Sequence, residues 1–268
     1  MRALILLSVA ALAQTPQFEV VSIHPSPPPD YAHGMTVGCS GGPVGYGDPS
    51  LFRCQNIGPS TLISMAYSLK PYQFPTPEWM KDVRIDISAK IPEGTAKDQF
   101  PLMMKTLLVE RFKLAVHWEK KEMTGYDLLL AKGGAKFKES KGEPEGDDVA
   151  WNMQKDAEGY PVLPGNKSTM AAIAGGYSTQ RWANEPVESI AGMLEFRLNG
   201  AVDNATGLTG KYDMLLHWIM DGGRVSDDIH GPTLLQALQD QLGLRVQKKK
   251  VTVDVLVVDH LEKAPTEN

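Results

Sequence analysis

Apolar residues change their spacing twice within residues 232–258, and this stretch constrains the fold more than any other. Between residues 234 and 242 leucines recur at helical spacing, and Gly243 is placed where helices commonly end in a left-handed residue. Two runs of alternating apolar and polar residues follow, which is typical of half-buried strands. The lysines at 248–250 separate the runs and predict a solvated turn. This helix and its two strands cannot cover their own apolar face, so they require a partner.

An earlier part of the chain repeats this order of elements. Residues 84–87 (Arg-Ile-Asp-Ile) match residues 211–214 (Lys-Tyr-Asp-Met), and the apolar positions 108, 112, 114 and 116 match 238, 242, 244 and 246 at one constant offset. Residues 126–130 then match 253–257. The shared order predicts an α+β fold of two related helix-strand-strand units with mixed or antiparallel sheets. The alternative is a chance alignment of generic apolar residues.

The first residues predict export from the cytoplasm. Residues 1–13 combine Arg2, an apolar run and the small-residue ending Ala11-Leu12-Ala13, which is the pattern of a secretory signal peptide. The alternative is a short buried helix at the chain end. No later stretch is long and apolar enough to span a membrane, so we expect a secreted or periplasmic mature chain without a membrane span.

The mature chain divides into three parts. Residues 14–140 are expected to form the first unit, and residues 166–268 the second. Residues 141–165 are polar and lack periodicity, so we predict a linker or a long surface loop there. At 42% hydrophobic content the chain can build real cores, and 27 basic against 32 acidic side chains argue against a nucleic-acid partner.

The only two cysteines, Cys39 and Cys54, predict a disulfide bond in an exported protein. The intervening loop is rich in glycine and proline, so its two flanks can approach each other. Closing a loop of this size stabilises the fold by about 3 kcal/mol in the chain-entropy model. The alternative is a two-ligand metal site, for which neither further thiols nor a nearby histidine pair is present.

Several motifs together resemble the uncharacterised "soil-associated" family of exported bacterial proteins, a domain of unknown function. They cover nearly the whole mature chain: residues 18–26, 61–67, 77–79, 84–90, 107–114, 202–203, 206–213, 234–244 and 264–268. Asn199-Gly200-Ala201 departs from the Arg-Pro pair usual in that family. The resemblance implies an extracytoplasmic sensing or partner-binding role, because related domains are sometimes joined to membrane sensors. A fainter similarity links residues 233–258 to the short N-terminal domains of secretins and TonB-dependent receptors.

The catalytic motifs are weak. Residues 38–42 satisfy Gly-x-Ser-x-Gly around Ser40, but proline and more glycines follow where a nucleophile elbow needs a helix. Asp227 and Asp228 with His230 offer hard oxygen and nitrogen ligands for a metal, although a solvated loop explains them better. The pair Asp259-His260 has the same two interpretations. We therefore predict no cofactor and assign no catalytic residue.

Two other patterns suggest surfaces. His117-Trp118 and His217-Trp218 place the same residue pair in a predicted strand of each unit, which indicates a shared binding surface or, alternatively, strand histidines beside packed indoles. Residues 206–210 (Thr-Gly-Leu-Thr-Gly) can present backbone N–H groups to an anion, or can simply form a tight connection.

These observations leave two hypotheses for the function. The first is an exported, non-enzymatic binding or sensing module of the cell envelope, whose partner is an envelope protein or a small ligand. The second is an exported hydrolase, metal-assisted in one form, that uses histidine and aspartate residues brought together by the fold.

Overall fold

The chain forms two compact units in the computed structural model, which describes residues 15–27, 37–42, 47–142, 154–164, 169–220 and 229–266. Unit 1 comprises Met1–Glu119 and Asp254–Asn268, and unit 2 comprises Lys120–Val253. The C-terminal residues thus belong with the first half of the chain, and residues 141–165 fall inside unit 2 rather than between the units. The predicted signal peptide lies outside the described residues.

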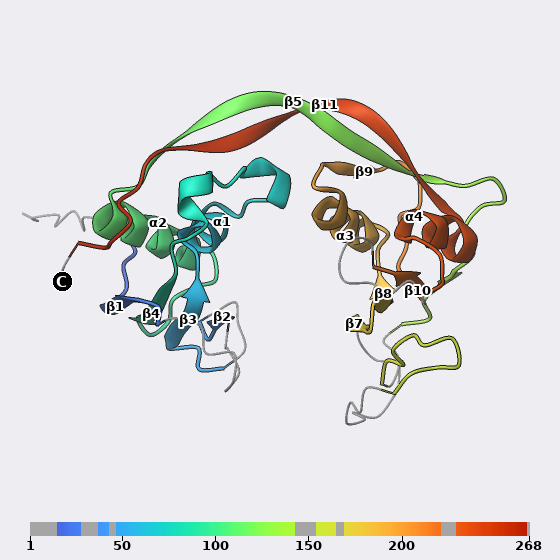
Figure 1. Ribbon diagram of the computed structural model, residues 1–268, viewed down its shortest axis with the longest axis horizontal. Helices are drawn as coiled ribbons and strands as arrows, with labels where there is room; N and C mark the ends of the chain where they lie inside the picture. The colour runs from blue at the N-terminus through green and yellow to red at the C-terminus, as the bar shows by residue number, and fades with distance from the viewer. Residues whose placement is uncertain are drawn as a thin grey trace, which may run out of the picture. The chain divides into compact units, whose positions relative to one another are not determined.

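Unit 1 is built on a four-stranded antiparallel sheet in the order β1-β4-β3-β2 (Figure 1). Helices α1 (Pro59–Tyr67) and α2 (Gln99–Phe112) pack on one face, and short 3-10 turns, η1 (Pro71–Gln73) and η2 (Glu78–Met80), follow α1. The bounds of the strands are β1 Val20–Pro25, β2 Gly38–Ser40, β3 Leu51–Ile57 and β4 Ile85–Lys90.

The buried face of this sheet follows from strand alternation. Ile85, Ile87 and Ala89 of β4 are buried, whereas Asp86 and Ser88 point to the opposite face. The helices supply apolar stripes to the same core, and the end of the chain adds two further leucines, Leu256 and Leu261. The sheet therefore has one packed face and one face open to solvent.

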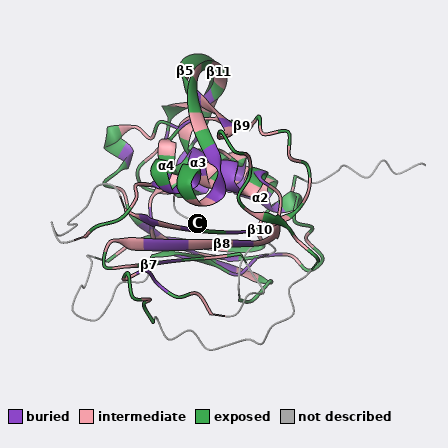
Figure 2. Ribbon diagram, turned by 90° about the vertical axis from the view of Figure 1, so that its right-hand side faces the viewer, coloured by how far each residue is buried: buried purple, intermediate pink, exposed green. Residues whose placement is uncertain are grey.

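Unit 2 has a four-stranded sheet in the order β6-β10-β8-β7, with α3 (Glu188–Leu198) and α4 (Leu234–Ala237) on one side (Figure 2). A π-helical turn, η3 (Leu238–Leu242), continues α4, and Gly243 ends it in the left-handed region as predicted. Thr233 caps α4, where its hydroxyl accepts a hydrogen bond from the backbone N–H of Gln236. The bounds of the strands are β6 Lys138–Glu139, β7 Met170–Ala174, β8 Tyr177–Glu185 and β10 Tyr212–Ile219.

Two long strands, β5 (Ala115–Leu130) and β11 (Leu244–His260), are neighbours in a third sheet, in which β9 (Val202–Asn204) pairs with β5 in parallel. The turn predicted at residues 248–250 does not form, because these residues lie inside the continuous strand β11; the charged residues 119–122 likewise lie inside β5. Most residues in the middle of β5 are exposed on both faces of the strand. A strand that is solvated on both faces carries charged residues on both, so its sequence resembles that of a solvated turn.

The predicted mixed α+β class is confirmed, and the topology supports two related units. Each unit runs strand, strand, strand, helix, strand, helix, long strand, and its first strand pairs with its fourth strand in the sheet (β9 lies between α3 and β10). Register agrees as well: Arg53 of β3 faces Ser88 of β4, and Arg181 of β8 faces Leu215 of β10. The helices that follow β3 and β8 both end on a left-handed residue.

Candidate functional site

A hollow of about 490 Å³ lies on the open face of the unit 1 sheet, and we call it the sheet-face hollow. All four strands of the sheet contribute to its lining. Its residues are Ser22, His24, Val37, Gly38, Cys39, Ser40, Arg53, Cys54, Gln55, Asp86, Ile87 and Ser88. Most of these side chains can donate or accept hydrogen bonds, so the hollow suits a polar ligand.

Strand register sets the order of polar groups in the hollow. Ser40 faces Arg53, Arg53 faces Ser88, and Ser88 faces Ser22, so a single row crosses all four strands. Neighbouring strands lie about 4.8 Å apart, which places one guanidinium between hydroxyl groups at regular intervals. The row needs no long-range loop to assemble it, because antiparallel pairing alone positions every member.

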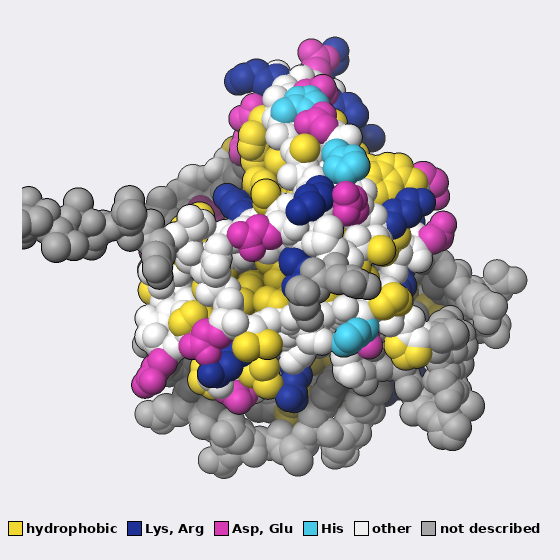
Figure 3. Space-filling view, turned by 90° about the vertical axis from the view of Figure 1, so that its left-hand side faces the viewer, with side chains coloured by type: hydrophobic (Ala, Val, Ile, Leu, Met, Phe, Trp, Pro, Cys, Tyr) yellow, Lys and Arg dark blue, Asp and Glu magenta, His cyan; other side chains and the backbone are white. Residues whose placement is uncertain are grey.

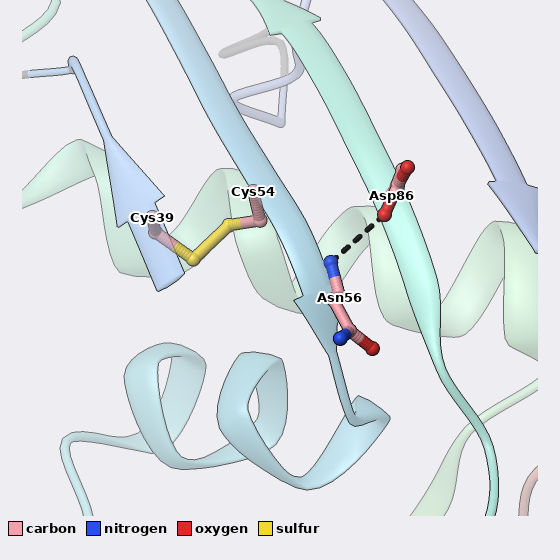
Figure 4. The surroundings of a disulfide bond; sticks show 4 residues. All are labelled: Cys39, Cys54, Asn56 and Asp86. Atoms are coloured by element: carbon pink, nitrogen blue, oxygen red, sulfur yellow. Dashed lines mark hydrogen bonds between the residues drawn. A yellow bond between two sulfur atoms is a disulfide. The ribbon is translucent and has the colours of Figure 1, made fainter. Parts of the chain in front are cut away.

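The disulfide between Cys39 and Cys54 holds the edge of the hollow (Figure 4). The two residues are direct partners in the register of β2 and β3, and their Cα atoms are 4.0 Å apart. Cys54 is buried in the core, whereas Cys39 lies on the three-residue edge strand β2, in which every residue is exposed. The predicted disulfide is confirmed, and it ties the three-residue edge strand β2 covalently to β3.

Asp86 fixes the opposite end of the hollow. Its Oδ1 accepts a hydrogen bond from the Ser26 hydroxyl at 2.6 Å and one from the backbone N–H of Asn56 at 2.8 Å (Figure 4). Asn56 has a φ of 51°, and the pairing of β3 with β4 shifts register at this point. The carboxylate therefore satisfies the N–H group that the irregular backbone frees.

The remaining groups of the hollow are available to a ligand. Among the described residues, the Arg53 guanidinium and the Ser88 hydroxyl have no hydrogen-bond partner, and Arg53 is exposed. Ser22 Oγ lies 2.7 Å from His24 Nε2. On the face of unit 1 drawn in Figure 3, acidic and basic side chains are interspersed, with no large patch of one sign. That face therefore carries no strong field of one sign.

His117 lies in a second polar cluster of unit 1. Its Nδ1 is 2.8 Å from Asp259 Oδ1, and its Nε2 is 3.0 Å from Glu119 Oε1. The hydrogen bond to Glu119, followed by that to Asp259, raises the pKa of His117 above its usual value. Both carboxylates are exposed, so the cluster is a surface tie between β5 and β11.

The predicted His-Trp surface is not formed by equivalent residues. Trp218 is only 2% exposed and packs in the core of unit 2, whereas Trp118 is 49% exposed in β5. His217 is half-buried, donates or accepts a 3.0 Å hydrogen bond with the Thr179 hydroxyl, and contacts the Tyr160 ring. Burial lowers the pKa of His217. The two pairs therefore lie on different types of strand and in different units.

The predicted metal ligands, the Gly-x-Ser-x-Gly motif and the loop at residues 206–210 do not form a further site among the described residues. Asp227 and Asp228 lie outside the described residues, and in the part of the chain that the structure describes no three His, Cys, Asp or Glu side chains are arranged so that they could hold a metal ion. Ser40 is on the edge strand β2, without the strand-to-helix turn of a nucleophile elbow. In the loop at residues 206–210 a backbone N–H is hydrogen-bonded within the loop itself: Leu208 N–H donates to the Thr206 hydroxyl at 3.1 Å.

Sequence reasoning missed Ser22, Arg53 and Ser88 as site residues. Each alternates with buried apolar residues on its strand, and this pattern ordinarily indicates a solvated face. The sequence repeat gave no signal for them, because the equivalence of Arg53 and Arg181 becomes visible only in the strand registers of the two sheets.

The family model described as "Protein of unknown function (DUF3738)" matches residues 60–261. The chain therefore belongs to this family of uncharacterised domains. Comparison with curated proteins and with solved structures finds no match. The resemblances to the soil-associated family and to the secretin and TonB-dependent receptor domains stay predictions. No helix among the described residues is long and apolar enough to cross a membrane.

Proposed function

We propose that this protein is an exported, non-enzymatic binding module of the cell envelope, and that the sheet-face hollow is its binding surface. The observation that carries the proposal is the row Ser40-Arg53-Ser88-Ser22, in which the first three side chains have no hydrogen-bond partner among the described residues. A preorganised polar surface binds with little loss of side-chain freedom.

Export is supported by the signal-like residues 1–13 and by the disulfide, which forms and persists in oxidising compartments. The test is the mass of the chain recovered from the periplasm or medium. Cleavage after Ala13 gives a mature chain that begins at Gln14. Recovery of the full-length chain from the cytoplasm, with reduced cysteines, would contradict export.

Binding is tested by filling the hollow. Ser88→Trp places an indole in the middle of the polar row, and Leu215→Trp places the same indole at the matching position of unit 2. We expect the wild-type chain and Leu215→Trp to co-sediment with purified cell envelopes, and Ser88→Trp to lose this binding. Equal sedimentation of both variants, or none by the wild type, would refute the assignment.

One contact favours a second candidate, an exported hydrolase. Ser22 Oγ lies 2.7 Å from His24 Nε2, within the reach that a nucleophile and its general base require. The test is hydrolysis of p-nitrophenyl acetate by the wild type, Ser22→Ala and a Ser40→Ala control. A rate above background that disappears only in Ser22→Ala would support the hydrolase. The binding module predicts no difference among the three.

A further inference from the structure

The internal repeat gives unit 2 a sheet face that is equivalent to the hollow. Arg181 on β8 faces Met170 on β7 and Leu215 on β10, as Arg53 on β3 faces Ser40 and Ser88. Both arginines lie two residues before the position where their strand shifts register against its partner. The same side chain therefore occurs at the same site of two related sheets.

In unit 2 this face holds a segment of the chain itself, residues 154–164. The Nη2 group of Arg181 donates a 3.0 Å hydrogen bond to the backbone carbonyl of Pro164. Tyr160, only 8% exposed, packs edge-on against Tyr177 and beside His217 on the same face of the sheet. In unit 2 the occupant of this face is thus a polypeptide segment, and the arginine binds its main chain.

In unit 1 the equivalent arginine is open. Arg53 is exposed and, among the described residues, forms no hydrogen bond. It lines the sheet-face hollow together with the hydroxyls of Ser40 and Ser88, of which neither has a hydrogen-bond partner in the described part of the chain. The open sheet face of unit 1 therefore has an arginine at the position that binds main chain in unit 2, and the hollow beside Arg53 leaves room for a ligand.

We infer that the sheet-face hollow binds a polypeptide segment of a partner protein, with a main-chain carbonyl of that segment accepting hydrogen bonds from Arg53. This inference rests on the proposed binding function and names its ligand class. A segment that crosses four strands spans about 14 Å, which corresponds to roughly four extended residues.

The floor of the hollow defines the chemistry of the segment. In unit 2 the rings of Tyr177 and His217 contact Tyr160 of the bound segment. In unit 1 the hollow is lined instead by Ser22, His24 and Gln55. Hydroxyl, imidazole and amide groups exchange hydrogen bonds with peptide groups and with polar side chains. The partner segment is therefore polar where residues 154–164 present Tyr160, and the chain's own segment is not the expected ligand.

The test selects peptides directly. A phage library of random dodecapeptides is passed over the full-length protein after depletion on Ser88→Trp, and enriched peptides are synthesised with a fluorophore for anisotropy. We expect peptides that bind the wild type, that bind Arg53→Ala at least tenfold more weakly, and that bind Leu215→Trp with unchanged affinity. A bidentate donor is lost in Arg53→Lys, so partial rescue at most is expected there.

Two results would overturn the inference. Peptides whose affinity does not change in Arg53→Ala would place the binding site elsewhere, and a library without peptides specific for the hollow would exclude a polypeptide ligand. A different result would refute the proposed function itself: no binding of cell envelopes by the wild type, or binding by Ser88→Trp that equals that of the wild type. Envelope binding that depends on the hollow and survives proteinase K digestion of the envelopes would retain the function and reject the peptide.

Discussion

The two related units predict a matched pair of destabilising substitutions, Asp86→Ala and Asp213→Ala. In each unit the carboxylate accepts a 2.8 Å hydrogen bond from the backbone N–H of a left-handed asparagine, Asn56 or Asn184. Asp86 also accepts a 2.6 Å bond from Ser26. Bonds to charged groups contribute about 1.5–3 kcal/mol each. Because these sites are partly solvated, we take the lower end and expect losses of about 3 kcal/mol for Asp86→Ala and about 1.5 kcal/mol for Asp213→Ala.

Urea unfolding followed by hydrogen exchange and mass spectrometry measures both losses and locates them. Exchange should rise in β3 and β4 for Asp86→Ala, and in β8 and β10 for Asp213→Ala. Asp86→Asn, which keeps an acceptor oxygen but removes the charge, should recover part of the loss. Equal losses in the two variants would refute the contribution of the Ser26 bond. A loss spread evenly over both units would refute the reasoning that each carboxylate holds an irregularity of its own sheet.

Three further predictions concern stability. Replacing Cys39 and Cys54 together by alanine should lower the free energy of unfolding by about 3 kcal/mol in urea titrations, and an unchanged midpoint would contradict the structural role of the disulfide. His117 has a raised pKa, so its stabilising contribution is complete below about pH 6.5 and is lost as pH rises through the folded pKa. His217 has a lowered pKa, so its contribution has the opposite sign, and stability rises with pH up to about pH 6.5. Glutamine at either position should remove the corresponding slope from the melting temperature measured against pH. The buried Ser178 hydroxyl has no hydrogen-bond partner among the described residues, so Ser178→Ala should leave the melting temperature unchanged or raise it, whereas a clear decrease would indicate a missing partner.

The sequence was sufficient to predict the α+β class and the disulfide, because both depend on local pattern. In β4 and β10 apolar residues such as Ile85, Ile87 and Met214 alternate with polar or exposed ones. Strand geometry alone then places them on one face of the sheet. The continuity of β5 and β11 could not be predicted in this way. Charged residues on both faces occur in a solvated turn and in an exposed ribbon alike, and only tertiary pairing distinguishes the two.

The sheet-face hollow was not predictable from single residues. Arg53 lies between the buried Phe52 and Cys54, so its pattern is that of any solvated strand face. Its availability depends on what lies above the sheet, which no strand sequence encodes. The comparison with Arg181, whose burial under its own chain lowers its pKa, gives Arg53 its significance.

The account's central claim is that the open sheet face of unit 1 is the binding surface, and photocrosslinking in living cells tests it most directly. A photoreactive p-benzoylphenylalanine is placed at Ser88 and, in a separate chain, at Leu215, where the side chain is 47% exposed. We predict an adduct with an envelope protein from position 88 and none from position 215. The absence of an adduct at 88, or the same adducts from both positions, would contradict the claim.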